Sequence, residues 1–162
     1  EQSDKYFQIG IWFLEMDDIE NAFINFKKSI DCFPTHYKNL KGIIQKTLSF
    51  GLIKEAKQYS TQLFEIEPTN PTGPQDLIDI YFKNEMPDLL IELFNELIDK
   101  NKNIEVLGNL NFHMGLVYIN IDNKTEGASC MAIARQHFEI VFPKDHIIFK
   151  SIKEFELTKQ SE

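Results

Sequence analysis

Apolar side chains recur every three or four residues along most of the chain, which is the spacing that lines one face of an α-helix. Tyr6, Ile9, Phe13 and Met16 form the first such series. No stretch of comparable length alternates apolar and polar residues as a strand does. The pattern predicts an all-α protein with helices over residues 4–16, 18–32, 36–49, 52–66, 73–84, 87–101, 104–121, 125–141 and 145–159.

Helix starts are marked by residues that cap or open a first turn. Asp17 and Asn123 are each followed three residues later by a glutamate, the spacing of a capping box. Thr35 and Thr72 stand where further N-caps are expected. Pro87 suits the first turn of a helix, where its missing N–H leaves no bond unmade.

The helical series repeats along the chain with a fixed period. Ala22 and Ala56 are 34 residues apart, and so are Pro34 and Pro68. A period of this size is typical of stacked helix pairs, each too small to bury its own apolar face. A small side chain such as alanine lets two helices approach closely where they cross.

Blocks of this period fall at about residues 3–36, 37–70, 71–104 and 108–143. Block one carries a spaced series of aromatic, small and proline residues, namely Tyr6, Ile9, Gly10, Phe13, Ala22, Phe26 and Pro34. The series resembles the tetratricopeptide pattern W-x2-L-G-x2-Y, A-x3-F, P. The resemblance implies one domain over residues 1–162, a right-handed superhelical solenoid of about four antiparallel helix pairs with a capping helix over residues 145–160.

The later blocks depart from the pattern at single positions. Ile44 stands at the glycine position of block two, and Leu90 at the alanine position of block three. Block four needs a three-residue shift, after which Gly115 takes the glycine position. Ala128 or Met131 then takes its alanine position.

The resemblance also implies a concave groove lined by the first helix of each pair. The groove positions are Phe7, Ile11, Leu14, Lys38, Lys41, Gln45, Gln75, Asp79, Phe82, Asn109, Phe112 and Leu116. Phe7 and Ile11 occupy the positions of the Lys and Asn that clamp a C-terminal carboxylate in chaperone-binding members, so a ligand of that class is not expected. An alternative interpretation places the apolar members of this set in the core.

Charge and composition narrow the choice of partners. The chain has 17 Lys and Arg against 25 Asp and Glu, and Arg135 is its single arginine. Nucleic acid is therefore not expected, because phosphate binding relies on clustered basic residues. The longest uncharged stretch, Val106 to Ile121, is too short and too polar to span a membrane. No secretory signal is visible, and Cys32 and Cys130 fit buried, reduced thiols, so a cytoplasmic protein is expected, although residue 1 is Glu and secretion stays open.

Catalytic and metal-binding patterns are not found in the sequence. The four histidines, His36, His113, His137 and His146, show no zinc-ligand spacing, and no glycine-rich phosphate loop occurs. We therefore predict no cofactor, no metal and no enzymatic activity. The predicted function is a protein-interaction module that binds a partner peptide or helix in an apolar groove. The alternatives are a structural segment of a larger array and a self-associating homodimer.

Overall fold

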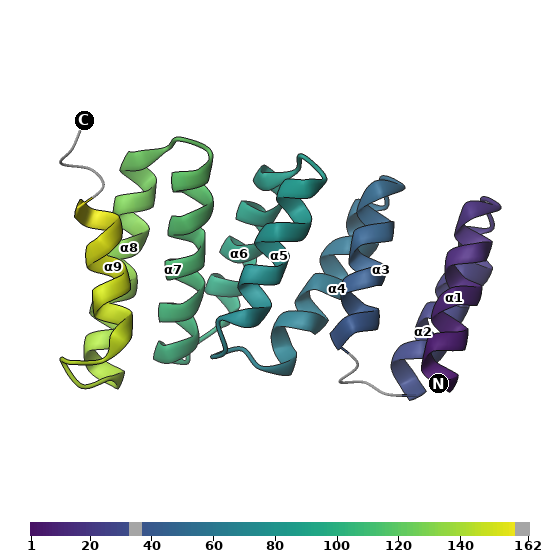
Figure 1. Ribbon diagram of the computed structural model, residues 1–162, viewed down its shortest axis with the longest axis horizontal. Helices are drawn as coiled ribbons and strands as arrows, with labels where there is room; N and C mark the ends of the chain where they lie inside the picture. Colours follow the sequence, from purple (N-terminus) through teal and green to yellow (C-terminus); the bar gives the residue numbers. More distant parts are fainter. Residues whose placement is uncertain (33–36, 158–162) are drawn as a thin grey trace. The chain divides into compact units, whose positions relative to one another are not determined.

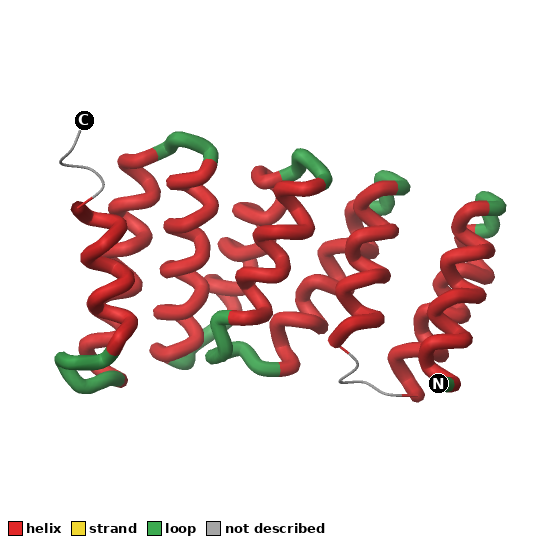
Figure 2. Tube along the Cα trace, in the orientation of Figure 1, coloured by secondary structure: helices red, strands yellow, loops and turns green. Residues whose placement is uncertain are grey.

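The computed structural model describes residues 1–32 and 37–157, and within these ranges every regular element is a helix (Figures 1 and 2). The helices are α1 (Gln2–Glu15), α2 (Ile19–Cys32), α3 (Tyr37–Ser49), α4 (Ile53–Ile66), α5 (Thr72–Lys83), α6 (Pro87–Lys100), α7 (Ile104–Asn120), α8 (Lys124–Val141) and α9 (Ile147–Leu157). The all-α prediction is confirmed, and each helix begins and ends within a few residues of its predicted range. Thr35 lies outside the described residues.

Two compact units make up the chain, Glu1–Ile66 with α1 to α4 and Glu67–Glu162 with α5 to α9. Each unit is described by itself. The single domain predicted over residues 1–162 stays a prediction.

In the first unit, α1 and α2 pack antiparallel around one glycine. A Cβ atom at Gly10 would lie 2.5 Å from Phe26 Cδ1 and 3.1 Å from the carbonyl oxygen of Ala22. Ala22 and Phe26 are themselves fully buried. The small residues predicted at the crossing are therefore where the two helices meet, and the phenylalanine ring fills the space beside them.

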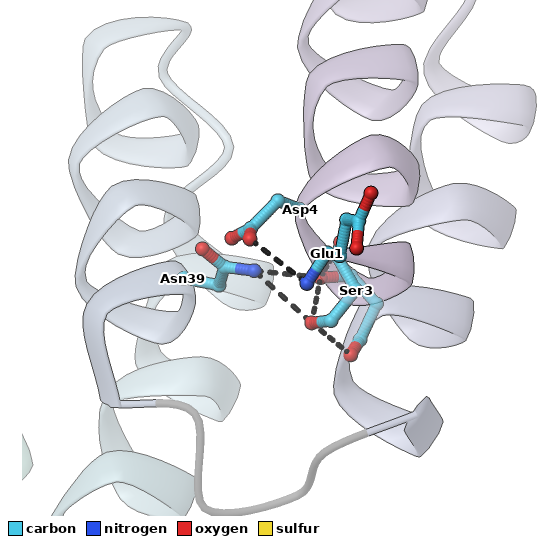
Figure 3. Close-up of polar contacts among 5 residues, drawn as sticks. Glu1, Ser3, Asp4 and Asn39 are labelled. Atoms are coloured by element: carbon cyan, nitrogen blue, oxygen red, sulfur yellow. Dashed lines mark hydrogen bonds and ion pairs between the residues drawn. The ribbon is translucent and has the colours of Figure 1, made fainter.

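A buried polar cluster joins α3 to this pair. Ser3 Oγ donates to the carbonyl oxygen of Ser29 at 2.8 Å, and Ser29 Oγ donates to that of Ser3 at 2.8 Å. Asn39 Nδ2 from α3 lies 3.1 Å from Ser3 Oγ and 3.2 Å from Ser29 Oγ (Figure 3). Because unpaired polar groups are costly in a core, these bonds favour one register of α3 against α1 and α2.

The second pair, α3 and α4, repeats the arrangement with larger residues. Ala56 is fully buried, as predicted, and Ile44, at the position that holds glycine in block one, is also fully buried. The ring of Phe23 on α2 stacks on Tyr59 of α4 with centroids 6.2 Å apart. This ring pair is a contact between the second helices of the two pairs.

In the second unit, α7 and α8 approach most closely at a pair of glycines. A Cβ atom at Gly115 would lie 3.2 Å from the carbonyl oxygen of Gly127 and 3.1 Å from Met131 Cε. Gly127, rather than Ala128 or Met131, therefore takes the small position of block four, so that prediction is wrong. Met131 instead fills the position that Phe26 holds in block one.

The turn inside each helix pair recurs at one position of the repeat. Asp17, Gly51, Glu85 and Asp122 are the described residues with positive φ, at 61°, 71°, 58° and 62°. The next residue in each turn donates its backbone N–H to the carbonyl five residues before it, at 2.8–2.9 Å. This is the Schellman arrangement that ends a helix with one left-handed residue. Three turns are 34 residues apart in sequence, and the fourth carries the predicted three-residue shift.

Two of the predicted helix starts are confirmed, and two are displaced. Asn123 Oδ1 accepts from the backbone N–H of Glu126, and Pro87 is the first residue of α6. Asp17 is instead the left-handed turn residue, and its neighbour Asp18 accepts from the N–H of Asn21. Thr72 lies inside the first turn of α5, and its own N–H donates to Asn70 Oδ1 at 2.9 Å.

Helix α9 covers the last helix pair, as the sequence predicts for a capping helix. Ile152 is fully buried in a cluster with Phe112 of α7 and Phe138 of α8, and Ile148 and Phe155 pack against the same cluster. The opposite side of α9 carries the exposed residues Lys150, Lys153 and Glu154. The outer side of α9 therefore combines charged side chains with the exposed Ile147.

Candidate functional site

The predicted groove positions of the first unit divide between surface and core. Phe7 and Ile11 are half-buried, and the ring of Phe7 packs on Gly42, where an added Cβ atom would lie 2.5 Å from Phe7 Cζ. Leu14 is only 1% exposed. Leu14 therefore belongs to the core of the first unit, and its prediction as a groove residue is wrong.

On α3 the predicted positions carry long polar side chains. Lys38 is exposed, while Gln45 is half-buried. Lys41 is half-buried, with its Nζ 5.9 Å from the ring centroid of Tyr37. Lys46 Nζ lies 3.7 Å from Glu15 Oε1 of α1, so an ion pair crosses from one first helix to the next. A partly exposed pair of this kind adds little stability, but it leaves both charges at the surface.

In the second unit, α5 and α7 border an open hollow of about 350 Å³. Its walls are Pro71, Thr72, Gln75, Asp76, Phe112 and His113. The structure thus brings together Gln75 and Phe112, two residues that the repeat pattern places at equivalent positions of successive blocks. The α5 wall is polar, since Gln75 Nε2 donates to Asp79 Oδ1 at 3.1 Å.

Further along α5 and α7, the predicted positions lie deeper than expected. Phe82 is half-buried, whereas Phe112 is 8% exposed and packs edge-on against Phe155 of α9, with centroids 6.1 Å apart. Leu116 is half-buried and packs on the same cluster. Phe112 therefore lines the hollow with the small part of its ring that is exposed, and most of the ring is core. Helix α9 covers the surface that Phe112 and Leu116 would otherwise present.

Asn109 is buried and has a structural task. Its Nδ2 donates to the carbonyl oxygens of Pro68 at 2.9 Å and Asn70 at 3.1 Å. These bonds satisfy main-chain groups of the segment that leads into α5. The prediction of Asn109 as a groove-lining residue is therefore wrong. Its hydrogen bonds instead help to fix the position of the α5 wall.

His113 is a residue of the hollow that sequence reasoning left without a role. Its side chain is buried, and Nδ1 donates to the carbonyl oxygen of Asn109 at 2.8 Å, since that oxygen can only accept. Burial lowers the pKa of His113 from 6.5 to about 4, and the bond to Asn109 opposes the shift. The wall therefore presents a neutral imidazole near pH 7. Its place one residue after Phe112 is the only sequence signal that could have found it.

A second hollow of about 600 Å³ lies where α8 leads into α9, and sequence reasoning missed it. Arg135, Glu139, Phe142, Lys144 and Phe149 line it. Arg135 Nη2 lies 3.5 Å from Glu156 Oε2, so part of its charge is already paired. Among the described residues, no three His, Cys, Asp or Glu side chains converge as metal ligands would. None of the described helices combines the length and apolar character needed to cross a membrane.

Comparisons with known proteins return structures but no sequence family. No family model and no curated protein matches the chain. The crystal structure of MamA is 17% identical over 99% of this chain and 94% of its own, with a TM-score of 0.42. The thermophilic TPR protein TTC0263 of Thermus thermophilus is 15% identical over 97% of this chain and 82% of its own, with a TM-score of 0.46. At TM-scores below 0.5, these likenesses carry no argument.

The assignment of the fold rests on the chain itself. Its helix pairs share one turn geometry at a 34-residue step, and small residues sit at the crossings of α1 with α2 and of α7 with α8. The fold is all-α and tetratricopeptide-like. That arrangement accounts for the position of the hollow between α5 and α7, which are the first helices of successive pairs.

Proposed function

We propose that the chain is a non-catalytic protein-interaction module and that a peptide or helix of a partner binds on the first helices of the pairs. The hollow between α5 and α7 is the observation that carries the proposal. Its volume of about 350 Å³ accommodates one or two side chains, and its walls combine an aromatic edge with polar groups. Sites of this composition orient a ligand through a few polar contacts while they bury its apolar part.

The chemistry of the walls favours a ligand of mixed character. Gln75 supplies an amide and Phe112 an aromatic edge to the hollow. The exposed Asp79 and the half-buried Phe82 lie farther along α5 and add a carboxylate and a ring beyond it. In the first unit, the half-buried Ile11 and Gln45 on α1 and α3 offer a similar mixture. A segment with one apolar anchor flanked by amide or basic side chains fits these walls.

The proposal is tested with peptides selected from a random displayed library against the whole chain. Gln75→Ala and Phe82→Ala should each weaken a selected peptide by about tenfold, which corresponds to about 1.4 kcal/mol. Asp99→Ala, at an exposed position of α6 on the second helix of the pair, is the matched control and should leave the affinity unchanged. Selected peptides that bind all three variants equally would place the binding surface elsewhere.

A further inference from the structure

The larger of the two hollows in the second unit, which we call the α8–α9 hollow, brings charged groups and aromatic rings together. Helices α8 and α9 lie side by side there (Figure 1). The hollow measures about 600 Å³, and its lining residues are Arg135, Glu139, Phe142, Lys144 and Phe149. Pockets that bind small molecules have volumes of about 300–1,000 Å³ and combine apolar walls with a few polar groups. The α8–α9 hollow has this size and this kind of wall.

The aromatic wall of the α8–α9 hollow is held in place by contacts of the chain itself. The ring of Phe142 stacks on that of His146, with centroids 4.1 Å apart and an angle of 7° between the planes. His146 Nδ1 accepts from the backbone N–H of Ile148 at 3.3 Å, so its ring is tied to the start of α9. The Phe142 ring also lies 5.6 Å from that of the buried Phe138. A wall that is ordered in this way favours binding, because little conformational freedom is lost when a ligand arrives.

The packing of α9 does not account for Arg135. Its Nη2 atom lies 3.5 Å from Glu156 Oε2, a long contact, and both side chains are partly exposed. Such a pair adds little stability, and α9 is held instead by the fully buried Ile152. The Nε–H of Arg135 is buried and has no acceptor among the described residues, which is costly for a polar group. With five N–H donors, the guanidinium can bind a further acceptor in the hollow while Glu156 stays beside it.

The charges around the α8–α9 hollow narrow the choice of acceptor. Arg135 and Lys144 supply positive charge, while Glu139 in the wall and Glu156 beside Arg135 supply negative charge. This near balance favours an acceptor with one negative charge over a dianion such as a phosphate monoester. A carboxylate carries one charge, and its two oxygens match the planar fork of a guanidinium.

We propose that the α8–α9 hollow binds a small monocarboxylate that carries an aromatic or aliphatic group. The carboxylate pairs with Arg135 and Lys144, and the apolar group packs against Phe142 and Phe149. This hollow shares no lining residue with the hollow between α5 and α7. The proposal is therefore independent of the function proposed above.

Titration of the whole isotope-labelled chain with phenylacetate, followed by nuclear magnetic resonance, tests the proposal. The amide signals of Phe142 and Phe149 should shift, while those of Gln75 and His113 at the other hollow should stay in place. Phenylacetamide, which lacks the charge, and acetate, which lacks the ring, should each bind about tenfold more weakly or worse. Equal binding of phenylacetate and phenylacetamide would overturn the proposal, and so would shifts confined to other helices.

Two further probes define the ligand class. Phenyl phosphate keeps the ring but adds negative charge, and tighter binding of phenyl phosphate than of phenylacetate would overturn the choice of a carboxylate. A short peptide that ends in phenylalanine carries the same chemistry at the end of a polypeptide. Weaker binding of the peptide than of phenylacetate would support a free acid as the ligand, and tighter binding would support a chain end. Failure of both carboxylates to bind would overturn the proposal.

Four variants distinguish a ligand site from a structural ion pair. Arg135→Gln should weaken phenylacetate binding by about tenfold or more, and Lys144→Gln, at an exposed position, by a few-fold. Glu156→Gln should strengthen it, because the competing carboxylate is removed. Lys100→Gln, at an exposed position of α6, is the matched control and should leave the affinity unchanged.

Far-UV circular dichroism and the melting temperature verify that each variant is folded, and Lys144→Gln serves as the test if Arg135→Gln is not. An unchanged affinity in the folded Arg135 and Lys144 variants would overturn the proposal. Weaker binding in Glu156→Gln would also overturn it, because that result is expected if the ion pair only supports the fold.

Discussion

Gly10 and Phe26 meet so closely that α1 has no room for a side chain at its crossing with α2. An added Cβ atom would lie 2.5 Å from Phe26 Cδ1, and the ring is fully buried. The ring cannot move away without displacing its neighbours, so the helices themselves would have to separate.

Gly10→Ala should therefore destabilise the chain by about 1–3 kcal/mol. The direction of the change is diagnostic, because in an ordinary helix interior alanine is more stable than glycine by about 1 kcal/mol. Urea unfolding measures the effect, with Gln8→Ala on the exposed side of α1 as the control. A stabilised Gly10→Ala would show that the two helices are not packed this closely.

Substitutions at two of the left-handed turn residues should change the stability of the chain in opposite directions. Glu85 has φ of 58°, a conformation that costs a residue with a side chain about 1–2 kcal/mol. Glu85→Gly should raise the free energy of unfolding by about 1 kcal/mol. Gly51→Ala should lower it by a similar amount, although nothing lies within 4 Å of the added Cβ atom, because φ at Gly51 is 71°. Thermal melts of both variants test the assignment, and a shift in the same direction for both would contradict it.

The burial of Phe112 reverses what the groove prediction implied for its removal. Phe112 belongs to the cluster with Ile152 and Phe138. Phe112→Ala should therefore lower the free energy of unfolding of the chain by about 3–5 kcal/mol. Phe82→Ala, at a half-buried position, should cost markedly less. Denaturant unfolding distinguishes the two residues, and a nearly unchanged midpoint for Phe112→Ala would restore the groove interpretation.

His113 makes the stability depend on pH in a window set by its lowered pKa. Above pH 6.5 the imidazole is neutral in both the folded and unfolded chain. Between 6.5 and about 4 the unfolded chain binds a proton that the folded chain does not, so the free energy of unfolding falls as the pH falls, by up to about 3 kcal/mol. Below about 4 both states are protonated and this contribution stays constant.

The measurement is the free energy of unfolding from pH 6.5 down to about 5, before most carboxylates titrate. His113→Gln removes the ionisable group and should flatten the slope in this window. Equal slopes in the two proteins would mean that other groups cause the pH dependence.

The two cysteines should differ sharply in reactivity. Cys32 is exposed, whereas Cys130 is buried. Burial and, secondarily, the charge of Glu126 raise the pKa of Cys130 to about 11, and the thiolate is the reactive form. A disulfide reagent at neutral pH should modify Cys32 rapidly, and Cys130 only when the chain unfolds. Cys32→Ser should abolish the rapid phase, and a rapid phase that survives would contradict the assignment.

The sequence was sufficient to predict the helices, their pairing and the small residues at the helix crossings of the first two blocks. Periodicity records which side of a helix is buried, so Ala22, Ala56 and the α9 stripe could be recognised from spacing alone. Cys32 was predicted to be buried and is exposed, because it is the last residue of α2, where the periodic pattern stops.

The depth of the groove could not be predicted in the same way. Whether Phe112 is lining or core depends on where α9 packs, and the repeat pattern does not include that helix. The predictions of Leu14 and Asn109 as groove residues failed for a related reason. Each residue is buried by neighbouring parts of the chain whose positions are set by tertiary contacts. Family-derived lining positions identify a side of a helix, but the exposure of each residue depends on its neighbours.

The four equivalent turns place one comparable amide proton in every helix pair. The N–H groups of Asp18, Leu52, Met86 and Asn123 all donate to a carbonyl five residues earlier, in nearly the same geometry. Differences in their rates of exchange with deuterium would therefore reflect how readily each pair opens, with little contribution from differences in the bond itself. Measured together, these amides can tell whether residues 1–66 and the remainder of the chain unfold as one cooperative unit or as two.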